Sequence, residues 1–264
     1  MTAAEQPADL APASPPILPP RKSREPRVWK FIGTSLWGVA LFGAMFAGQV
    51  AVVAYFLVTS GETMDTSAMT ALLTNGRIIS LSVIMGLPAI LAMLWLATRL
   101  SRTPFADYLA LRWPSWRMLA TGVASMVLLM VAWEVISRVA GRASSPGFMM
   151  DVLKTARADG ALWLLVFAFC VAAPIVEEFF ARGFLYRGWS ESFLRPAGAI
   201  LLSSAVWTMM HLQYNWFFLA QVFSIGVLLG YLRYRSNSTW LVVVLHGLNN
   251  LAATVQTIWL ANNP

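Results

Sequence analysis

The sequence predicts an all-α protein: a polytopic membrane helix bundle of about seven transmembrane helices, with a short interfacial helix and a disordered N-terminal tail. Of the 264 residues, 58% are hydrophobic and only 12% are charged, whereas soluble domains carry about 25% charged residues. Apolar stretches long enough to cross a bilayer recur along the chain, except in its first thirty residues. This composition excludes an ordinary soluble enzyme, a nucleic-acid-binding module and a wholly disordered protein.

The N-terminal region, residues 1–30, is rich in proline and alanine and ends in a basic cluster made of Arg21, Lys22, Arg24, Arg27 and Lys30. Such a segment cannot bury enough apolar surface to offset its ordering entropy, so we expect a disordered cytoplasmic tail. The apolar stretch that follows is too long for an ordinary cleaved signal peptide and is interpreted as an anchor. The single cysteine, Cys170, excludes a disulfide framework and a thiolate zinc ribbon.

A transmembrane helix needs about 20 mostly apolar residues, and seven segments qualify as candidates. The fifth and sixth are short and nearly continuous, so six or eight spans remain open. Residues 103–116 alternate apolar with charged side chains, which predicts a short helix at the membrane interface. The candidate spans are 31–58, 77–98, 118–140, 161–186, 196–212, 215–232 and 238–261.

The basic residues predict the orientation. The net charge of +7 is better explained by basic residues at cytoplasmic membrane edges than by a nucleic-acid partner. They concentrate in the tail and in alternate connections, while the first opposite connection carries Glu62 and Asp65. The connection at residues 141–160 is an exception with three basic residues, which two acidic residues partly offset: Arg142, Lys154, Arg157, Asp151 and Asp159. We therefore expect a multi-pass protein of the plasma membrane with a cytoplasmic N-terminus and an external C-terminus. The connection residues are Arg99, Arg102, Arg112, Arg117, Arg187, Arg195, Arg233 and Arg235.

A few ionisable residues fall inside the predicted spans, where each costs at least a few kcal/mol and is by default a functional hypothesis. Glu134 precedes Arg138 by four residues, a spacing that favours a structural ion pair. The remaining ones are Glu177, Glu178, Arg182, His211 and His246, accompanied by the amides Asn249 and Asn250.

The adjacent acids Glu177 and Glu178 point about 100° apart on a helix and therefore face different surroundings. Glu178 can pair with Arg182 four residues later, which leaves Glu177 free to face an interior cavity. Pro174 removes one backbone donor, which leaves the Cys170 carbonyl in need of another partner and predicts a bend just before the acids. The alternative is a buried charge network that only locks helices together.

Both histidines of the chain lie in apolar segments, and His246 and Asn250 are one turn apart on the same helix face. A carboxylate and an imidazole can activate water. A second imidazole and an amide can donate hydrogen bonds to the oxyanion formed when water attacks a peptide carbonyl. These side chains are the components of a hydrolase that has no covalent nucleophile.

The motifs resemble those of the CPBP family, which contains type II CAAX prenyl endopeptidases and bacteriocin-processing or immunity proteins, also called Abi. Residues 161–255 carry the resemblance: Glu-Glu-x-x-x-Arg at 177–182, an aromatic-x-x-x-His motif ending at His211, and His-x-x-x-Asn at 246–250. The second motif departs from the family, because Trp207 stands where phenylalanine is usual, which keeps an aromatic wall but changes its size. Residues 31–160 match no family motif and are predicted from their apolar spans to be N-terminal transmembrane helices, whereas the resemblance implies a CPBP-like catalytic core at 161–262.

The resemblance also implies residue roles. Glu177 and His211 would activate the water, His246 and Asn250 would stabilise the oxyanion, and Glu178 and Arg182 would support Glu177. No cofactor is expected. Zinc held by Glu177, His211 and His246 is the alternative, but the chain has no His-Glu-x-x-His spacing in its favour.

The leading hypothesis is an intramembrane endopeptidase that cuts a membrane-associated peptide or protein. A non-catalytic scaffold or immunity protein of the same family is one alternative. A small proton-coupled transporter is another, although the inverted repeats common in transporters are not visible. With the predicted spans, Glu177 and His246 fall in the cytoplasmic half of the membrane, while His211 falls nearer the outer face. Helix tilt, a bend at Pro174 or a lower start of the fifth helix would reconcile them.

Overall fold

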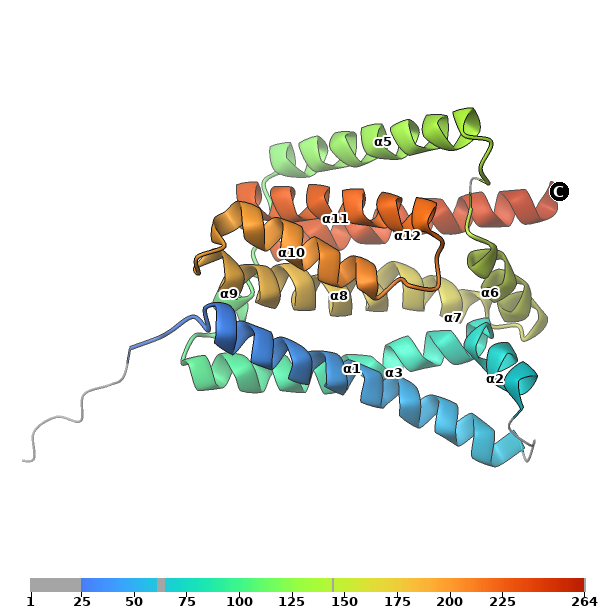
Figure 1. The fold of residues 1–264 in the computed structure, drawn as a ribbon, viewed down its shortest axis with the longest axis horizontal. Helices are drawn as coiled ribbons and strands as arrows, with labels where there is room; N and C mark the ends of the chain where they lie inside the picture. Colours follow the sequence, from blue (N-terminus) through green and yellow to red (C-terminus); the bar gives the residue numbers. More distant parts are fainter. Residues whose placement is uncertain (1–24, 61–64, 144, 264) are drawn as a thin grey trace, which may run out of the picture.

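The computed structural model describes residues 25–60, 65–143 and 145–263, and within these ranges the chain is a bundle of helices without strands (Figure 1). The all-α fold class is confirmed. The predicted disorder of residues 1–24, with three members of the basic cluster, lies outside the described residues.

The N-terminal layer is formed by α1 (Phe31–Ser60) and α3 (Gly76–Ser101), which lie side by side and are joined through the short α2 (Thr66–Leu73) (Figure 1). They cross closely at two glycines: a Cβ atom on Gly48 would lie 2.7 Å from the Gly86 Cα. The crossing therefore requires glycine at residue 48.

The segment before α1 is attached to α3. The backbone N–H of Arg27 donates to the Ser101 carbonyl at 3.0 Å, and the Trp29 indole N–H donates to the Ala97 carbonyl at 3.0 Å. Contact with the bundle therefore begins before the predicted tail boundary at residue 30.

The predicted interfacial helix at residues 103–116 is shorter than expected and more deeply packed. Only the single turn α4 (Phe105–Tyr108) is helical, and Tyr108 and Leu109 are completely buried. The Thr239 hydroxyl donates to the Leu109 carbonyl, and the Thr239 N–H donates to the Ala110 carbonyl at 3.0 Å. These contacts fix the connector against the start of α12 (Thr239–Asn262).

On the other side of the bundle, α5 (Trp116–Val139) packs against α11 and α12, and α6 (Gly147–Ala158) follows it (Figure 1). The predicted pair of Glu134 with Arg138 is present, with 2.7 Å between Oε1 and Nε. Gln256 of α12 donates to the other Glu134 oxygen at 3.3 Å, so the acid joins two helices and acts structurally.

The central helix is continuous over Leu162–Ser190 but changes its winding twice. Two π-helical segments interrupt it, and such segments occur frequently at functional sites. Its parts, in order, are α7 (Leu162–Phe167), η1 (Ala168–Ala172), α8 (Ala173–Glu178), η2 (Phe179–Leu185) and α9 (Tyr186–Ser190).

Six helices of the described ranges are long and apolar enough to cross a membrane, whereas seven were the working prediction. The difference is α10 (Arg195–Met209), which has 15 residues. At about 1.5 Å per residue it covers roughly 22 Å, less than the roughly 30 Å of a hydrocarbon core. It runs obliquely past the central helix and ends part-way along the bundle, where the chain turns into α11 (Trp216–Ser236) (Figure 1).

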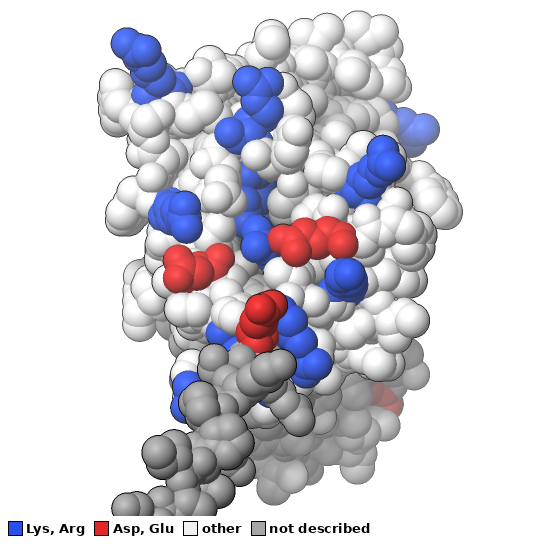
Figure 2. Space-filling model, turned by 90° about the vertical axis from the view of Figure 1, so that its left-hand side faces the viewer, with Lys and Arg blue, Asp and Glu red and all other residues white. Residues whose placement is uncertain are grey.

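The two ends of the bundle differ in charge. Figure 2 shows many Lys and Arg side chains, with fewer Asp and Glu, on the end where α1 begins. The C-terminus lies at the opposite end (Figure 1). The helix ends and connections at the basic end contribute Arg99, Arg102, Arg112, Arg117, Arg187, Arg195 and Arg235.

Candidate active site

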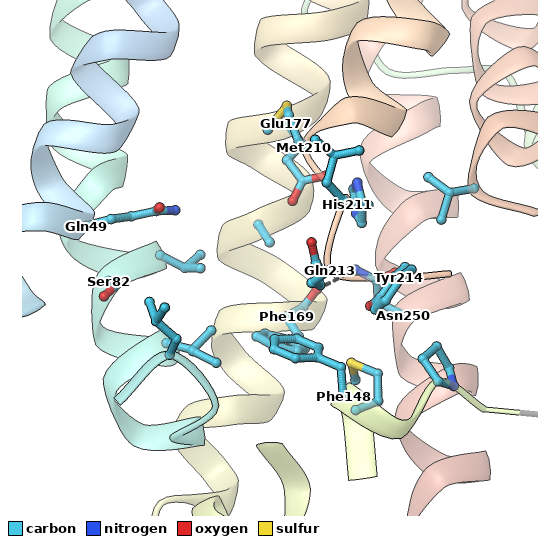
Figure 3. Close-up of a pocket in the computed structure, with 18 of the residues that line it drawn as sticks. Gln49, Ser82, Phe148, Phe169, Glu177, Met210, His211, Gln213, Tyr214 and Asn250 are labelled. Atoms are coloured by element: carbon cyan, nitrogen blue, oxygen red, sulfur yellow. Dashed lines mark hydrogen bonds between the residues drawn. The ribbon is translucent and has the colours of Figure 1, made fainter. Parts of the chain in front are cut away.

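The two adjacent acids at the end of α8 face different surroundings, as their spacing predicts. Glu178 is completely buried between helices. Glu177 is half-buried and lines a cavity, in which Figure 3 shows it near His211 and Met210.

Glu178 is the centre of a buried ion network. Its Oε1 atom accepts a hydrogen bond from Arg182 Nη1 at 2.8 Å and a second from His246 Nδ1 at 2.9 Å. Arg182 also donates from Nη2 to the Gly226 carbonyl at 3.0 Å. The predicted pair of Glu178 and Arg182 is therefore present, and it connects the central helix to α11 and α12.

Gly226 lets α11 approach this network. A Cβ atom at residue 226 would lie 3.0 Å from the Ser204 Cβ and 3.2 Å from Arg182 Nη2. The absence of a side chain brings the Gly226 carbonyl within reach of the guanidinium, which needs several acceptors because it carries five N–H donors.

Trp207 of α10 lies between the buried network and the cavity. Its indole N–H donates to Glu177 Oε2 at 2.5 Å. The guanidinium carbon of Arg182 is 4.6 Å from the centre of its ring. The imidazole rings of His211 and His246 pack edge-on against it, with ring centres 5.0 Å and 5.3 Å away. One side chain thus contacts four of the predicted site residues.

His211 lies in the turn after α10, and its Nδ1 atom is 3.0 Å from the Trp207 carbonyl. Because a carbonyl can only accept a hydrogen bond, Nδ1 must carry the proton, and in a neutral ring Nε2 then has a free lone pair. Because α10 ends part-way along the bundle, His211 lies at the same level of the bundle as Glu177. The predicted spans had placed His211 nearer the outer face, and this difference is thereby removed.

Asn250 of α12 attaches to the irregular part of the central helix. Its side-chain N–H donates to the Phe169 carbonyl at 2.8 Å. In η1 the Ala173 N–H bonds to the Ala168 carbonyl, so the next donor would be residue 174, a proline without an N–H. The Phe169 carbonyl, rather than that of Cys170, therefore takes a partner from another helix.

The cavity beside these side chains has a volume of about 980 Å³. One wall carries Glu177, His211, His246 and Asn250. The other comes from α1 and α3 and is mostly apolar, with Gln49 and Ser82 as polar members that Figure 3 shows across the cavity from Glu177. The arrangement places a carboxylate, an imidazole and amide donors beside an apolar space of substrate size.

Comparison with known families assigns this part of the chain. Residues 159–252 match the family described as type II CAAX prenyl endopeptidase Rce1-like. This segment is therefore similar to that family. The match confirms the resemblance recognised in the sequence. No curated protein and no solved structure matched the chain.

The Rce1-like segment contains all six predicted site residues and Trp207. The helices that form the far wall of the cavity, α1 and α3, lie outside it. The substrate-sized space is therefore built from both halves of the chain, whereas the ionisable side chains come from one.

The zinc alternative finds no ready ligand set. In the described ranges, no group of three or more His, Cys, Asp and Glu side chains is arranged to hold a metal ion.

Sequence analysis missed two members of the site. Trp207 was interpreted only as an aromatic wall, and the Phe169 carbonyl was not foreseen as a partner of Asn250. An indole N–H in an apolar helix needs an acceptor, and this requirement was the available signal for Trp207.

Proposed function

We propose that the protein is an intramembrane endopeptidase that hydrolyses peptide bonds of a membrane-associated peptide or protein. Water activated by Glu177 and His211 would perform the reaction without a metal ion or other cofactor. One observation carries the proposal: both side chains are anchored on Trp207 and border the same apolar cavity.

In this mechanism the Glu177 carboxylate accepts a proton from water, and the lone pair on His211 Nε2 accepts a hydrogen bond that orients the same water. The water oxygen bonds to the peptide carbonyl carbon, whose oxygen becomes an oxyanion. When the carbon–nitrogen bond breaks, the proton held by Glu177 passes to the leaving amine. Water enters and two peptide fragments leave, so that atoms and charges balance.

The oxyanion would be stabilised by donors from α12. The Asn250 amide has two N–H groups, and one of them is used by Phe169. The other is free to serve the reaction. His246 donates from Nδ1 to Glu178, and a ring that carries both protons would also donate to the oxyanion from Nε2.

Glu178 and Arg182 support these groups without touching the substrate. Both are completely buried, and their opposite charges compensate each other next to Glu177. The arginine also packs on the indole that holds Glu177. Removing either partner would leave a buried charge and displace the catalytic wall.

We also propose that the protein lies in the plasma membrane, with the basic end of the bundle facing the cytoplasm. Positive residues are enriched on cytoplasmic edges, and Lys and Arg side chains outnumber Asp and Glu on the end where α1 begins (Figure 2). Because α10 and α11 turn back part-way along the bundle, α1 begins at the basic end and α12 runs to the opposite end (Figure 1). The N-terminus would then be cytoplasmic and the C-terminus external.

The test is a comparison of new protein N-termini in membranes from cells that carry the wild type or Glu177→Gln. Glutamine keeps an acceptor for Trp207 but is no base, so we expect specific cleavage to fall at least about 100-fold and an uncut precursor to accumulate. Glu191→Gln is the matched control, because that acid pairs with Arg187 at an N–O distance of 3.0 Å and does not line the cavity. Identical N-termini in wild type and Glu177→Gln would refute the proposal.

A further inference from the structure

Trp207 differs from the other aromatic residues around the cavity because it offers a hydrogen-bond donor to a predicted catalytic group. The side chain is 2% exposed, so its indole N–H must find a partner inside the protein. That partner is Glu177 Oε2, at 2.5 Å. A phenylalanine at the same place could fill the space but could not make this bond.

The indole itself is held from its other sides. The Arg182 guanidinium packs on its ring face, and a Cβ atom at residue 226 would lie only 3.1 Å from its Cε3 atom. A ring confined in this way presents its N–H in one direction. The donor is therefore fixed before the substrate arrives, which reduces the cost of orienting the carboxylate.

The backbone of the same residue orients the second group. The Trp207 carbonyl accepts from His211 Nδ1 at 3.0 Å, which directs Nε2 away from α10. The side chain and main chain of one residue thus set the geometry of both groups proposed to activate water.

From these contacts we infer that Trp207 is a positioning residue, whose indole N–H holds the Glu177 carboxylate in the orientation needed for general-base catalysis. The inference rests on the proposed function. It assigns Trp207 a role that an aromatic wall alone would not have.

The first arm of the test removes the N–H and keeps the ring shape. Trp207 is replaced by β-(3-benzothienyl)alanine, which has sulfur in place of the indole N–H, and in parallel by phenylalanine, in the full-length protein. The substrate is the precursor that accumulates with Glu177→Gln. We expect kcat for its cleavage to fall about 10–100-fold in both variants, as for a misplaced catalytic group, with KM changed less than about twofold. An unchanged kcat in the benzothienyl variant overturns the inference, even if Trp207→Phe does not fold.

Trp133 provides the matched control. Its indole N–H donates to the Ser224 hydroxyl at 2.7 Å, and it does not line the cavity. Trp133→Phe should therefore keep kcat and KM, whereas an equal loss in this variant would mean that any indole replacement damages the enzyme and would overturn the inference.

The second arm does not depend on activity. In protein labelled with ¹⁵N at tryptophan, the Trp207 indole resonance is identified by its loss in Trp207→Phe. We expect this resonance to move upfield in Glu177→Gln, because a neutral acceptor binds the N–H more weakly than a carboxylate. An unmoved resonance overturns the contact. If the wild type cleaves no membrane protein, the proposed function fails, while the resonance still decides whether Trp207 holds Glu177.

Discussion

The side-chain N–H of Asn250 donates to the Phe169 carbonyl at 2.8 Å, across the contact between α12 and the π-helical segment of the central helix. This carbonyl has no backbone donor at residue 174 because that residue is proline. Asn250 therefore holds two helices together and also borders the cavity, so that its two contributions need separate tests.

A double-mutant cycle with Pro174→Ala separates them. Asn250→Ala should lower the free energy of unfolding by about 1 kcal/mol through the lost hydrogen bond. In the Pro174→Ala background the cost should shrink, since an alanine N–H can serve the Phe169 carbonyl. Equal costs in both backgrounds would contradict the compensation. Cleavage should remain low in the double variant, because the oxyanion donor is still missing.

The buried ion network predicts a large loss of stability that a second substitution partly restores. Arg182→Met leaves the Glu178 carboxylate buried beside one remaining donor, and we expect a loss of about 3–5 kcal/mol. Adding Glu178→Gln should recover part of it by removing the charge. Unfolding in detergent micelles measures both changes. Arg138→Met is the control, because 77% of that side chain is exposed and exposed ion pairs contribute about 1 kcal/mol or less. A similar loss of stability in both arginine variants would argue against the buried network.

Gly247 lies at a close approach of α12 to the central helix. A Cβ atom there would lie 2.6 Å from the Cys170 carbonyl oxygen, so Gly247→Ala must push the helices apart. We expect a loss of about 1–3 kcal/mol and reduced cleavage, because His246 and Asn250 move with α12. Gly43→Ala is the matched control on α1, where an added Cβ meets no atom within 4 Å. Equal stability of the two variants would refute the close approach.

The proposed orientation can be tested by thiol labelling of intact cells in a Cys170→Ser background. Arg117→Cys lies at the start of α5 on the basic end, and Asn263→Cys lies just beyond α12 at the opposite end. A membrane-impermeant maleimide should label residue 263 on intact cells and residue 117 only after lysis. The reverse pattern would place the N-terminus outside.

Local sequence spacing was enough to predict several features. The pairing of Glu178 with Arg182 follows from the four-residue spacing on a helix, and the long spans follow from their apolar length. The end of α10 could not be predicted, because hydropathy does not reveal that a helix stops inside a bundle. His246 bonds to Glu178, which lies 68 positions earlier in the chain. No local sequence pattern contains this contact.

The π-helical segments were also invisible in the sequence. Pro174 suggested a disturbed helix, but only the backbone register decides which carbonyl loses its donor. Likewise, the replacement of phenylalanine by Trp207 predicted a change of size. The direction of the indole N–H depends on Arg182 and Gly226, which pack against the ring from two other helices.

The close crossing of Gly48 and Gly86 bears on how the cavity is built. It fixes a pair of helices that contributes surface to the cavity but none of the ionisable side chains proposed to act on the peptide bond. If the proposed function holds, substitutions at Gln49 or Ser82 should change which polypeptides fit the cavity without altering the side chains proposed to hydrolyse them. The determinants of selectivity and of chemistry would then lie on separate stretches of the sequence.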